Sequence, residues 1–129
     1  MSVLFPKRYM TEWKKKLAMA DSNVISRVVG MLGLAMKAGK VVIGTEQVIT
    51  FLKKGKLELV LLSGNASDGT KKKITLKCEF YNTRTEQIEI STDEMGRILG
   101  KTYTPAVVGI TDENFSRAII NLLYGENDQ

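Results

Sequence analysis

The sequence predicts an α/β fold in which helices cover both faces of a central sheet. Short apolar runs alternate with amphipathic segments along most of the chain, and glycines or helix-capping residues stand between them. The chain has 129 residues, of which 43% are apolar, and this suits one domain with a substantial core. Neither an internal repeat nor an interdomain linker is apparent in the sequence.

Regular structure is expected from Asn23 onward. The first helix is indicated by apolar residues that recur on one helical face, and Gly39 is suited to end it. These apolar residues are Val24, Val28, Leu32 and Ala35. A short strand is expected at 41–43, followed by a helix at 44–54 with Val48, Phe51 and Leu52 inward.

The second half of the chain continues the alternation. The run 57–62 is nearly all apolar, which predicts a strand covered on both faces. The expected elements that follow are a helix at 70–81, a strand at 85–90 that is polar enough to lie near an edge, a helix from the Ser91–Glu94 capping box to about Leu99, a strand at 107–111, and a last helix capped by Asp112 with Phe115, Ile119 and Leu122 inward.

The two ends of the chain differ from this pattern. Residues 1–22 hold five basic and two acidic residues without a long period, so we expect a mobile arm, a short peripheral helix or a solvated tail. A single domain is expected over 23–125, and residues 126–129 are expected to fray.

The composition excludes several function classes. The chain has no histidine and a single cysteine, Cys78, which recurs with Ile74 and Tyr81 at the spacing of a buried helix face. This excludes histidine-based catalysis, disulfides and cysteine zinc sites, and no metal or other cofactor is expected. No apolar run is long enough to span a membrane and no signal-peptide pattern is present, which predicts a cytoplasmic protein.

Two segments approach the phosphate-binding P-loop pattern and fail it. Residues 96–102 end in Gly-Lys-Thr but have one residue too few and follow a predicted helix rather than a strand. Residues 33–40 have one residue too many, and Val41 stands where the magnesium-binding hydroxyl is required. The paired carboxylates at 93–94 and 112–113 are explained by helix capping. No catalytic residues are therefore predicted, and the protein is expected not to be an enzyme.

The most informative segment is Gly39–Gly55. Gly44 stands where a strand passes into a helix, so the N–H groups of the first helical turn surround Thr45, Glu46 and Gln47. Lys37 and Lys40 precede this helix, and Lys53 and Lys54 follow it. With a net charge of +5, these features favour a partner that carries phosphate.

The order of motifs resembles the L-seven-Ae family of ribosomal and kink-turn RNA-binding proteins, and within it the small bacterial members of the YlxQ type. The resemblance covers about Val24 to Leu123 and implies a three-layer α/β/α sandwich with a mixed, roughly four-stranded sheet. It also implies RNA binding without catalysis. It rests on the blocks GLAMKAGKVVIGTEQVITFLKKGKLELVLLSGNAS, TKKKI and MGRILGKTYTPAVVGIT.

The family motif after the first strand is Gly-x-Asn-Glu-x-x-Lys, which corresponds to the segment from Gly44 to Thr50. Gly44 matches, and Gln47 replaces the glutamate while keeping an acceptor and two donors. Glu46 replaces an asparagine or lysine and adds a negative charge, whereas Thr50 replaces a lysine. Thr45 completes the expected contact set.

The resemblance also implies that the loop before the last strand packs against a flipped-out base. Here that loop supplies Tyr103 and Pro105 for stacking, Ala106 beside them, and Lys101 for a phosphate. Lys37 and Lys40 are further candidates for phosphate contact. The loop at 63–67, usually acidic in the family, is neutral here.

The implied partner is RNA, either a kink-turn RNA or ribosomal RNA, with the ribosome itself as a further candidate partner. A monomer is expected, and no membrane contact. Two alternatives remain open: a protein–protein adaptor whose RNA binding is weak or lost, and an RNA-guiding partner of a separate RNA-modifying enzyme. The adaptor alternative rests on Glu46 and Thr50, which depart from the family motif.

Overall fold

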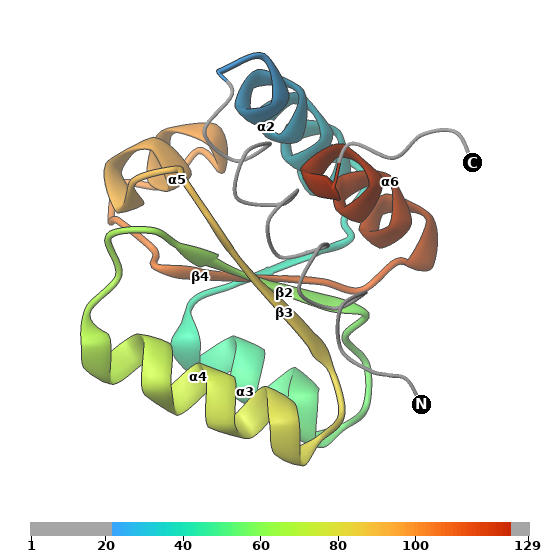
Figure 1. Ribbon diagram of the computed structural model, residues 1–129, viewed down its shortest axis with the longest axis vertical. Coiled ribbons are helices and arrows are strands. Elements are labelled where there is room, and N and C mark those ends of the chain that lie inside the picture. The colour runs from blue at the N-terminus through green and yellow to red at the C-terminus, as the bar shows by residue number, and fades with distance from the viewer. Residues whose placement is uncertain (1–21, 125–129) are drawn as a thin grey trace, which may run out of the picture.

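Residues 22–124 are described by the computed structural model, and in that range they form five helices and a four-stranded sheet (Figure 1). No helix in this range is long and apolar enough to cross a membrane. The arm expected at 1–22, except for Ser22, and the tail expected at 126–129 lie outside the described residues. The elements in chain order are α2 (Ser22–Lys37), β1 (Val41–Ile43), α3 (Thr45–Lys53), β2 (Leu59–Ser63), α4 (Asp68–Phe80), β3 (Arg84–Ile88), α5 (Thr92–Ile98), β4 (Val107–Ile110) and α6 (Glu113–Tyr124).

The sheet is mixed, with strand order β1-β4-β2-β3. β4 runs antiparallel to both of its neighbours, opposite Val41–Ile43 on one side and Leu59–Leu62 on the other. β2 and β3 run parallel, and a crossover through α4 connects them, as a parallel pair requires. The polar strand at 84–88 lies at an edge of the sheet, as its composition predicts.

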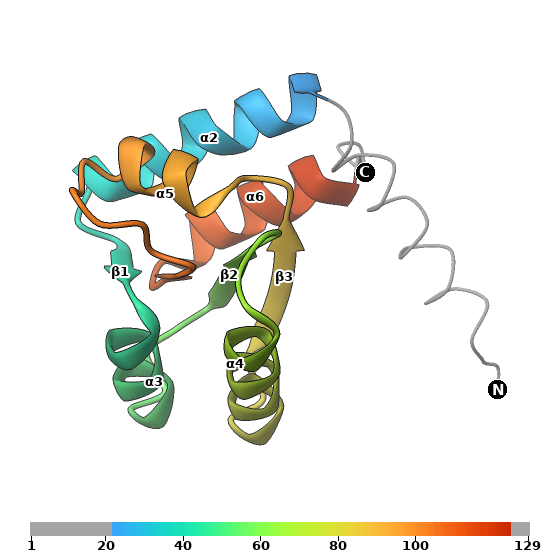
Figure 2. The same ribbon diagram turned by 90° about the vertical axis from the view of Figure 1, so that its left-hand side faces the viewer.

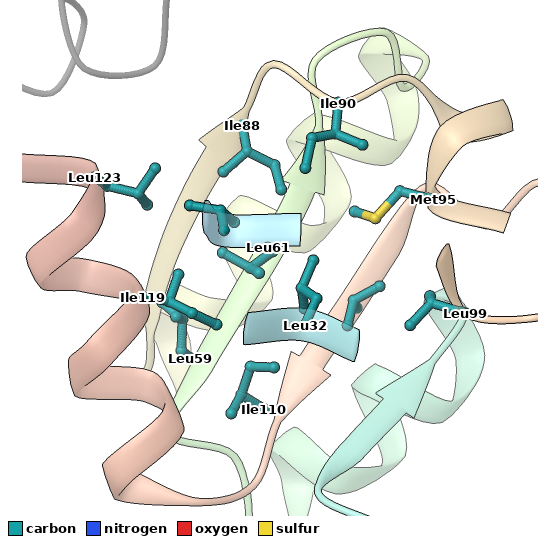
Figure 3. Packing of buried hydrophobic residues seen from close by; sticks show 12 residues of the cluster. Leu32, Leu59, Leu61, Ile88, Ile90, Met95, Leu99, Ile110, Ile119 and Leu123 are labelled. Carbon is teal, nitrogen blue, oxygen red and sulfur yellow. The ribbon is translucent and has the colours of Figure 1, made fainter. Parts of the chain in front are cut away.

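Helices cover both faces of the sheet, which confirms the predicted three-layer α/β/α sandwich (Figure 2). β2 explains how one strand serves both layers, because successive side chains of a strand point to opposite faces. Leu59 and Leu61 pack with α2, α5 and α6, whereas Val60 and Leu62 pack with α3 and α4. Figure 3 shows the first of these clusters, in which Leu32, Met95 and Ile119 surround Leu61.

Several boundaries and one buried face differ from the sequence prediction. α4 begins at Asp68 rather than Thr70, because Ser67 caps it by accepting the Thr70 N–H at 3.2 Å. β2 begins at Leu59 rather than Leu57, although Leu57 is buried. On α6 the fully buried residue is Leu123, four positions after Ile119, and the predicted Leu122 is only partly buried at the rim of that face.

The helix caps follow the sequence closely. Ser91 accepts the Glu94 N–H at 3.1 Å, and Asp112 accepts the Phe115 N–H at 3.0 Å. The Glu94 carboxylate pairs with Arg97 on the same helix. Each cap satisfies one of the N–H groups that a helix leaves without an internal partner at its start.

Cys78 is a core residue, as its spacing predicts. Its side chain is buried among the residues that join α3 and α4 to the sheet. Burial raises the pKa of the Cys78 thiol, and the nearby Thr85 side chain opposes this by a smaller amount. A thiol held in its neutral form inside the core is a poor nucleophile.

A buried carboxylate anchors the end of α6 to the edge strand β3. Glu86 is only 4% exposed and accepts a hydrogen bond from Arg84 Nε at 2.9 Å and from the Tyr124 hydroxyl at 3.0 Å. The Arg84 guanidinium also lies over the Tyr124 ring, 5.2 Å from its centroid. Burial, followed by the Glu86 charge, raises the pKa of Tyr124, so its hydroxyl stays protonated and donates.

Replacing Tyr124 by phenylalanine is therefore expected to lower the free energy of unfolding by about 1–2 kcal/mol, because a buried charged acceptor loses a donor. Urea unfolding followed by circular dichroism measures this change. Tyr103→Phe, at an exposed loop tyrosine, is the matched control and is expected to leave the midpoint unchanged. Equal midpoints for Tyr124→Phe and the parent protein would show that this contact does not anchor α6.

Candidate nucleic-acid interface

Three segments that are distant in sequence meet at one end of the sheet. The Gly44 N–H donates to the Val107 carbonyl at 3.0 Å, and the Ser63 N–H donates to the Ala106 carbonyl at 2.9 Å. The end of β1 and the end of β2 therefore both adjoin the beginning of β4. The start of α3, the loop 63–67 and the loop 101–106 lie together on the left of the view in Figure 1. We name this group of segments the interface edge.

The start of α3 differs from the starts of the three helices that follow it. α4, α5 and α6 each have a side-chain oxygen that accepts a first-turn N–H, whereas Gly44 at the N-cap of α3 has no side chain to offer. Gly44 has φ 98° and ψ 151°, a conformation that a residue with a Cβ rarely adopts. The first-turn N–H groups of α3 thus point out of the helix end without a side-chain acceptor from their own cap.

The polar residues predicted for RNA contact are on the outer side of α3. Glu46, Gln47 and Thr50 are exposed, while Val48 and Ile49 beneath them are buried against the sheet. The Thr50 hydroxyl donates to the Glu46 carbonyl at 3.0 Å, one helical turn earlier. The Thr50 hydroxyl is therefore bonded within its own helix. In this turn, Gln47 presents its carboxamide side chain on the surface.

The loop 101–106 presents one aromatic ring and holds it by a close backbone contact. Tyr103 is 53% exposed, whereas Pro105 is buried, so the tyrosine is the ring that the loop offers to a ligand. A Cβ on Gly96 of α5 would lie 2.5 Å from the Tyr103 carbonyl oxygen and 3.5 Å from Pro105 Cδ. The loop can pack this tightly on α5 only because residue 96 is glycine.

The loop 63–67 is fixed at the interface edge by hydrogen bonds that include the buried Ser63 hydroxyl. Ser63 Oγ lies 2.7 Å from the Ile90 carbonyl and 2.7 Å from Asn65 Oδ1, and Asn65 Oδ1 accepts the Thr92 N–H at 2.9 Å. These contacts tie the ends of β2 and β3 to the start of α5. The neutral residues at 64–65 thus have a structural role.

Two charged residues of this edge were not predicted from the sequence. Lys71 Nζ donates to the Gly64 carbonyl at 2.9 Å, which holds this lysine at the loop. The Glu89 carboxylate oxygens lie 3.5 Å from where a Cβ on Gly64 would be. Lys71 follows the cap Ser67 by one helical turn, and this spacing is the signal in the sequence from which it could have been found.

Lys37 and Lys40 are not part of this group. The Lys40 carbonyl accepts the Thr111 N–H at 3.0 Å, so Lys40 lies beside the end of β4. The strand β1 separates Lys40 from Gly44 by about 13 Å, at roughly 3.3 Å per residue. Lys37 lies in the last turn of α2, further back along the chain. Their proximity to Gly44 in the sequence is therefore not proximity in the fold.

The interface edge presents several kinds of group that can bind a ligand. Within residues 22–124, no three histidine, cysteine, aspartate or glutamate side chains lie close enough together to hold a metal ion. The edge offers helix N–H groups, a carboxamide, lysine ammonium groups and a tyrosine ring. These groups suit a ligand with hydrogen-bonding edges, phosphates and a flat aromatic surface.

Proteins with similar sequences are named as binding and ribosomal proteins. The chain is 41% identical to the RNA-binding protein YlxQ of Bacillus subtilis over 93 residues, which is 72% of this chain and 91% of that protein. It is 30% identical to the large ribosomal subunit protein eL30 of Methanocaldococcus jannaschii, over 64% of this chain and 74% of that protein. These names describe binding and ribosomal proteins, in agreement with the expected absence of enzyme activity.

Solved structures share the fold. A protein with unknown function from Bacillus halodurans C superposes with a TM-score of 0.69 at 34% identity, over 74% of this chain and 95% of that one. The 15.5kD RNA binding protein of Giardia lamblia superposes with a TM-score of 0.65 over 81% of this chain and 88% of that one. Its identity is 17%, so this second likeness concerns the fold alone.

The family model described as "Ribosomal protein L7Ae/L30e/S12e/Gadd45 family" matches residues 26–120, which include the whole sheet, α3, α4 and α5, and most of α2 and α6. The resemblance drawn from the sequence is thereby confirmed. The chain belongs to the ribosomal protein L7Ae/L30e/S12e/Gadd45 family.

Proposed function

We propose that this protein binds structured RNA of the kink-turn type through the interface edge, as a monomer and without catalysis. The observation that carries the proposal is the convergence of the α3 start and the loop 101–106, which the Gly44–Val107 hydrogen bond joins at 3.0 Å. The relatives named as RNA-binding and ribosomal proteins support RNA as the ligand class, with ribosomal or regulatory RNA as its setting.

Gln47 is the proposed reader of base edges. Its carboxamide is both donor and acceptor, so it matches the mixed donor and acceptor edges of purines that are not in Watson–Crick pairs. The N–H groups of the α3 first turn lie beside it and supply further donors of fixed direction. Because Val48 and Ile49 are buried against the sheet, the backbone of this turn, from which the Gln47 side chain extends, is held in place before RNA binds.

The loop 101–106 is proposed to hold an unstacked base. The exposed Tyr103 ring offers a flat surface for stacking, and Ala106 packs beneath the loop against the core. Lys101, which is exposed, and Lys71, which the Gly64 carbonyl holds at the loop, are proposed to meet phosphates of the same RNA. Pro105, being buried, shapes the loop and is not proposed as a stacking surface.

Glu46 and Thr50 are the two residues that favour the adaptor alternative. Glu46 is exposed in the first turn of α3, where its negative charge opposes a phosphate backbone. The Thr50 hydroxyl is occupied by the Glu46 carbonyl. If these changes outweigh the contacts of Gln47, the protein retains the fold and binds RNA weakly or not at all.

The proposed function is tested by titrating the full chain into a kink-turn RNA that carries a donor and an acceptor dye on its two helical arms. Without magnesium, binding is expected to bend the RNA and raise energy transfer, because the protein stabilises the bent form of the ensemble. A duplex of the same length without the internal loop is the control RNA. Equal affinity for both RNAs would refute kink-turn recognition, and binding to neither would favour the adaptor.

Gln47→Ala is expected to weaken kink-turn binding by about 1–3 kcal/mol, the scale of one specific base contact. The dissociation constant is measured in the same energy-transfer titration at fixed salt. Asn121→Ala, which removes an exposed carboxamide from α6 on the opposite layer, is the matched control and is expected to bind like the parent. A Gln47→Ala variant indistinguishable from the parent would remove Gln47 from the interface.

Glu46→Lys is expected to tighten RNA binding at low salt by roughly tenfold, because a negative charge near phosphate becomes positive. The gain is expected to shrink as salt rises, since exposed charges are screened. Glu46→Gln separates the removal of the negative charge from the addition of a positive one and is expected to lie between the two. No change at low salt would mean that Glu46 faces away from the RNA.

Gly96→Ala tests whether the position of the loop 101–106 matters. The new Cβ would meet the Tyr103 carbonyl oxygen at 2.5 Å, so the loop must shift. We expect a loss of stability of about 1–3 kcal/mol from overpacking, and weaker kink-turn binding at temperatures where the variant is folded. Gly33→Ala on α2, where nothing lies within 4 Å of the new Cβ, is the control and is expected to keep both properties.

A further inference from the structure

The helix α4 carries apolar side chains on two opposite faces. Its inner face buries Ile74 and Cys78 between α3 and the sheet. Its outer face exposes 55% of Leu76 and 79% of Phe80. Because these two residues are four positions apart, their side chains are neighbours on the helix surface.

The exposed pair is not required for the packing of the domain. Among the described residues, the exposed large apolar side chains are Leu34, Leu76, Phe80 and Tyr103. Only Leu76 and Phe80 of these are one turn apart on a single helix. The Phe80 ring is in edge contact with Tyr81, with centroids 4.9 Å apart and planes at 85°, and Tyr81 packs against the core. The ring is therefore oriented before any partner binds, which lowers the entropy cost of binding.

The charges next to this pair are mainly positive. Lys72 and Lys73 precede Leu76 by four and three residues, so both lie on the outer face, and both are exposed. Glu79 and, in the first turn, Asp68 are the acidic residues of α4 on that side of the helix. The alkyl stems of the two lysines extend the apolar surface, and their ammonium groups lie along its border. The partner surface that complements this arrangement is apolar at its centre and acidic at its rim.

A second copy of this chain does not fit that description. The exposed Leu34 lies on α2 with Arg27 and Lys37 on the same side of the helix, so pairing it with α4 would bring like charges together. Residues 1–22 are also basic, with five positive and two negative side chains. The exposed apolar side chain of α2 in a second copy therefore does not complement this face, which favours a different protein as the partner.

We infer that the outer face of α4, formed by Lys72, Lys73, Leu76 and Phe80, docks an acidic amphipathic segment of a protein partner through two apolar side chains one turn apart. Ser67, in the loop 63–67 of the interface edge, caps α4, and Leu76 and Phe80 lie nine and thirteen residues further on, about 14 and 20 Å along the helix axis. The apolar pair at the centre of the docking face is thus separate from the interface edge, although Lys72 at its rim follows directly after Lys71. The inference stands whether or not the interface edge binds RNA.

The test uses the full chain, isotope-labelled for NMR, and three probes. The first is a synthetic 14-residue helical peptide with two leucines at positions i and i+4 and glutamates around them. The second has lysine in place of every glutamate, and the third is a twelve-nucleotide oligouridine. The acidic peptide is expected to shift the Leu76 methyl and Phe80 ring signals, and the basic peptide is expected not to.

Leu76→Ser combined with Phe80→Ser is expected to weaken binding of the acidic peptide at least tenfold, because both apolar anchors of the docking face are removed. Lys72→Glu combined with Lys73→Glu is expected to transfer the preference to the basic peptide. Leu34→Ser, at an exposed leucine on the other layer, is expected to change nothing. Because both pairs of substitutions are on an exposed face, the variants are expected to fold. Unchanged NMR signals of the core residues verify this.

Three results would overturn the inference. Oligouridine that shifts the α4 signals while the acidic peptide does not would make this face an RNA contact. Signals of Leu76 and Phe80 that move with protein concentration alone would make it a contact between copies. An acidic peptide that binds without perturbing α4, or that binds the serine variant as well as the parent, would show that the outer face of α4 is not a docking surface.

Discussion

The antiparallel placement of β4 between β1 and β2 determines where the candidate interface lies. Since β1 and β2 run against β4, their carboxyl ends meet its amino end, and two backbone hydrogen bonds fix the junction at Gly44–Val107 and Ser63–Ala106. The segments that follow β1 and β2 and the loop that precedes β4 therefore lie at the same end of the sheet. A parallel β4 would place the loop 101–106 at the opposite end, about 13 Å or more from α3.

Two glycines convert this topology into a surface that a ligand can reach. Gly44 begins α3 without a capping side chain, whereas Ser67, Ser91 and Asp112 occupy the corresponding first-turn donors of the later helices. Gly96 lets the loop before β4 pack on α5 so closely that Tyr103 is held outward. Glycine is required at both positions by the local structure, because Gly44 has a φ of 98° and a Cβ on Gly96 would lie 2.5 Å from the Tyr103 carbonyl oxygen.

The sequence predicts what depends on local periodicity and misses what depends on strand direction. The five helices, the four strands and the edge position of β3 follow from apolar spacing and capping residues, because both are set within one turn or a few strand residues. Which strand ends meet the loop 101–106 depends instead on the direction of β4, and the sequence carries no local signal for it. The packing of the loop that contains Pro105 against Gly96 of α5 likewise arises from a contact between separate elements.

The charges at the interface edge decide what kind of RNA recognition it can support. Lys71 and Lys101 supply positive charge, while Glu46 and Glu89 oppose it, so the described part of this edge has little surplus for phosphate attraction. A protein that gathers RNA by electrostatics alone needs such a surplus, because affinity then comes from released counterions. Under the proposed function, directional contacts must supply the affinity instead: helix N–H groups, the Gln47 carboxamide and the Tyr103 ring. Because the backbone hydrogen bonds to β4 bring their segments together, these groups favour an RNA whose bent shape presents unpaired base edges and an extruded base at matching positions.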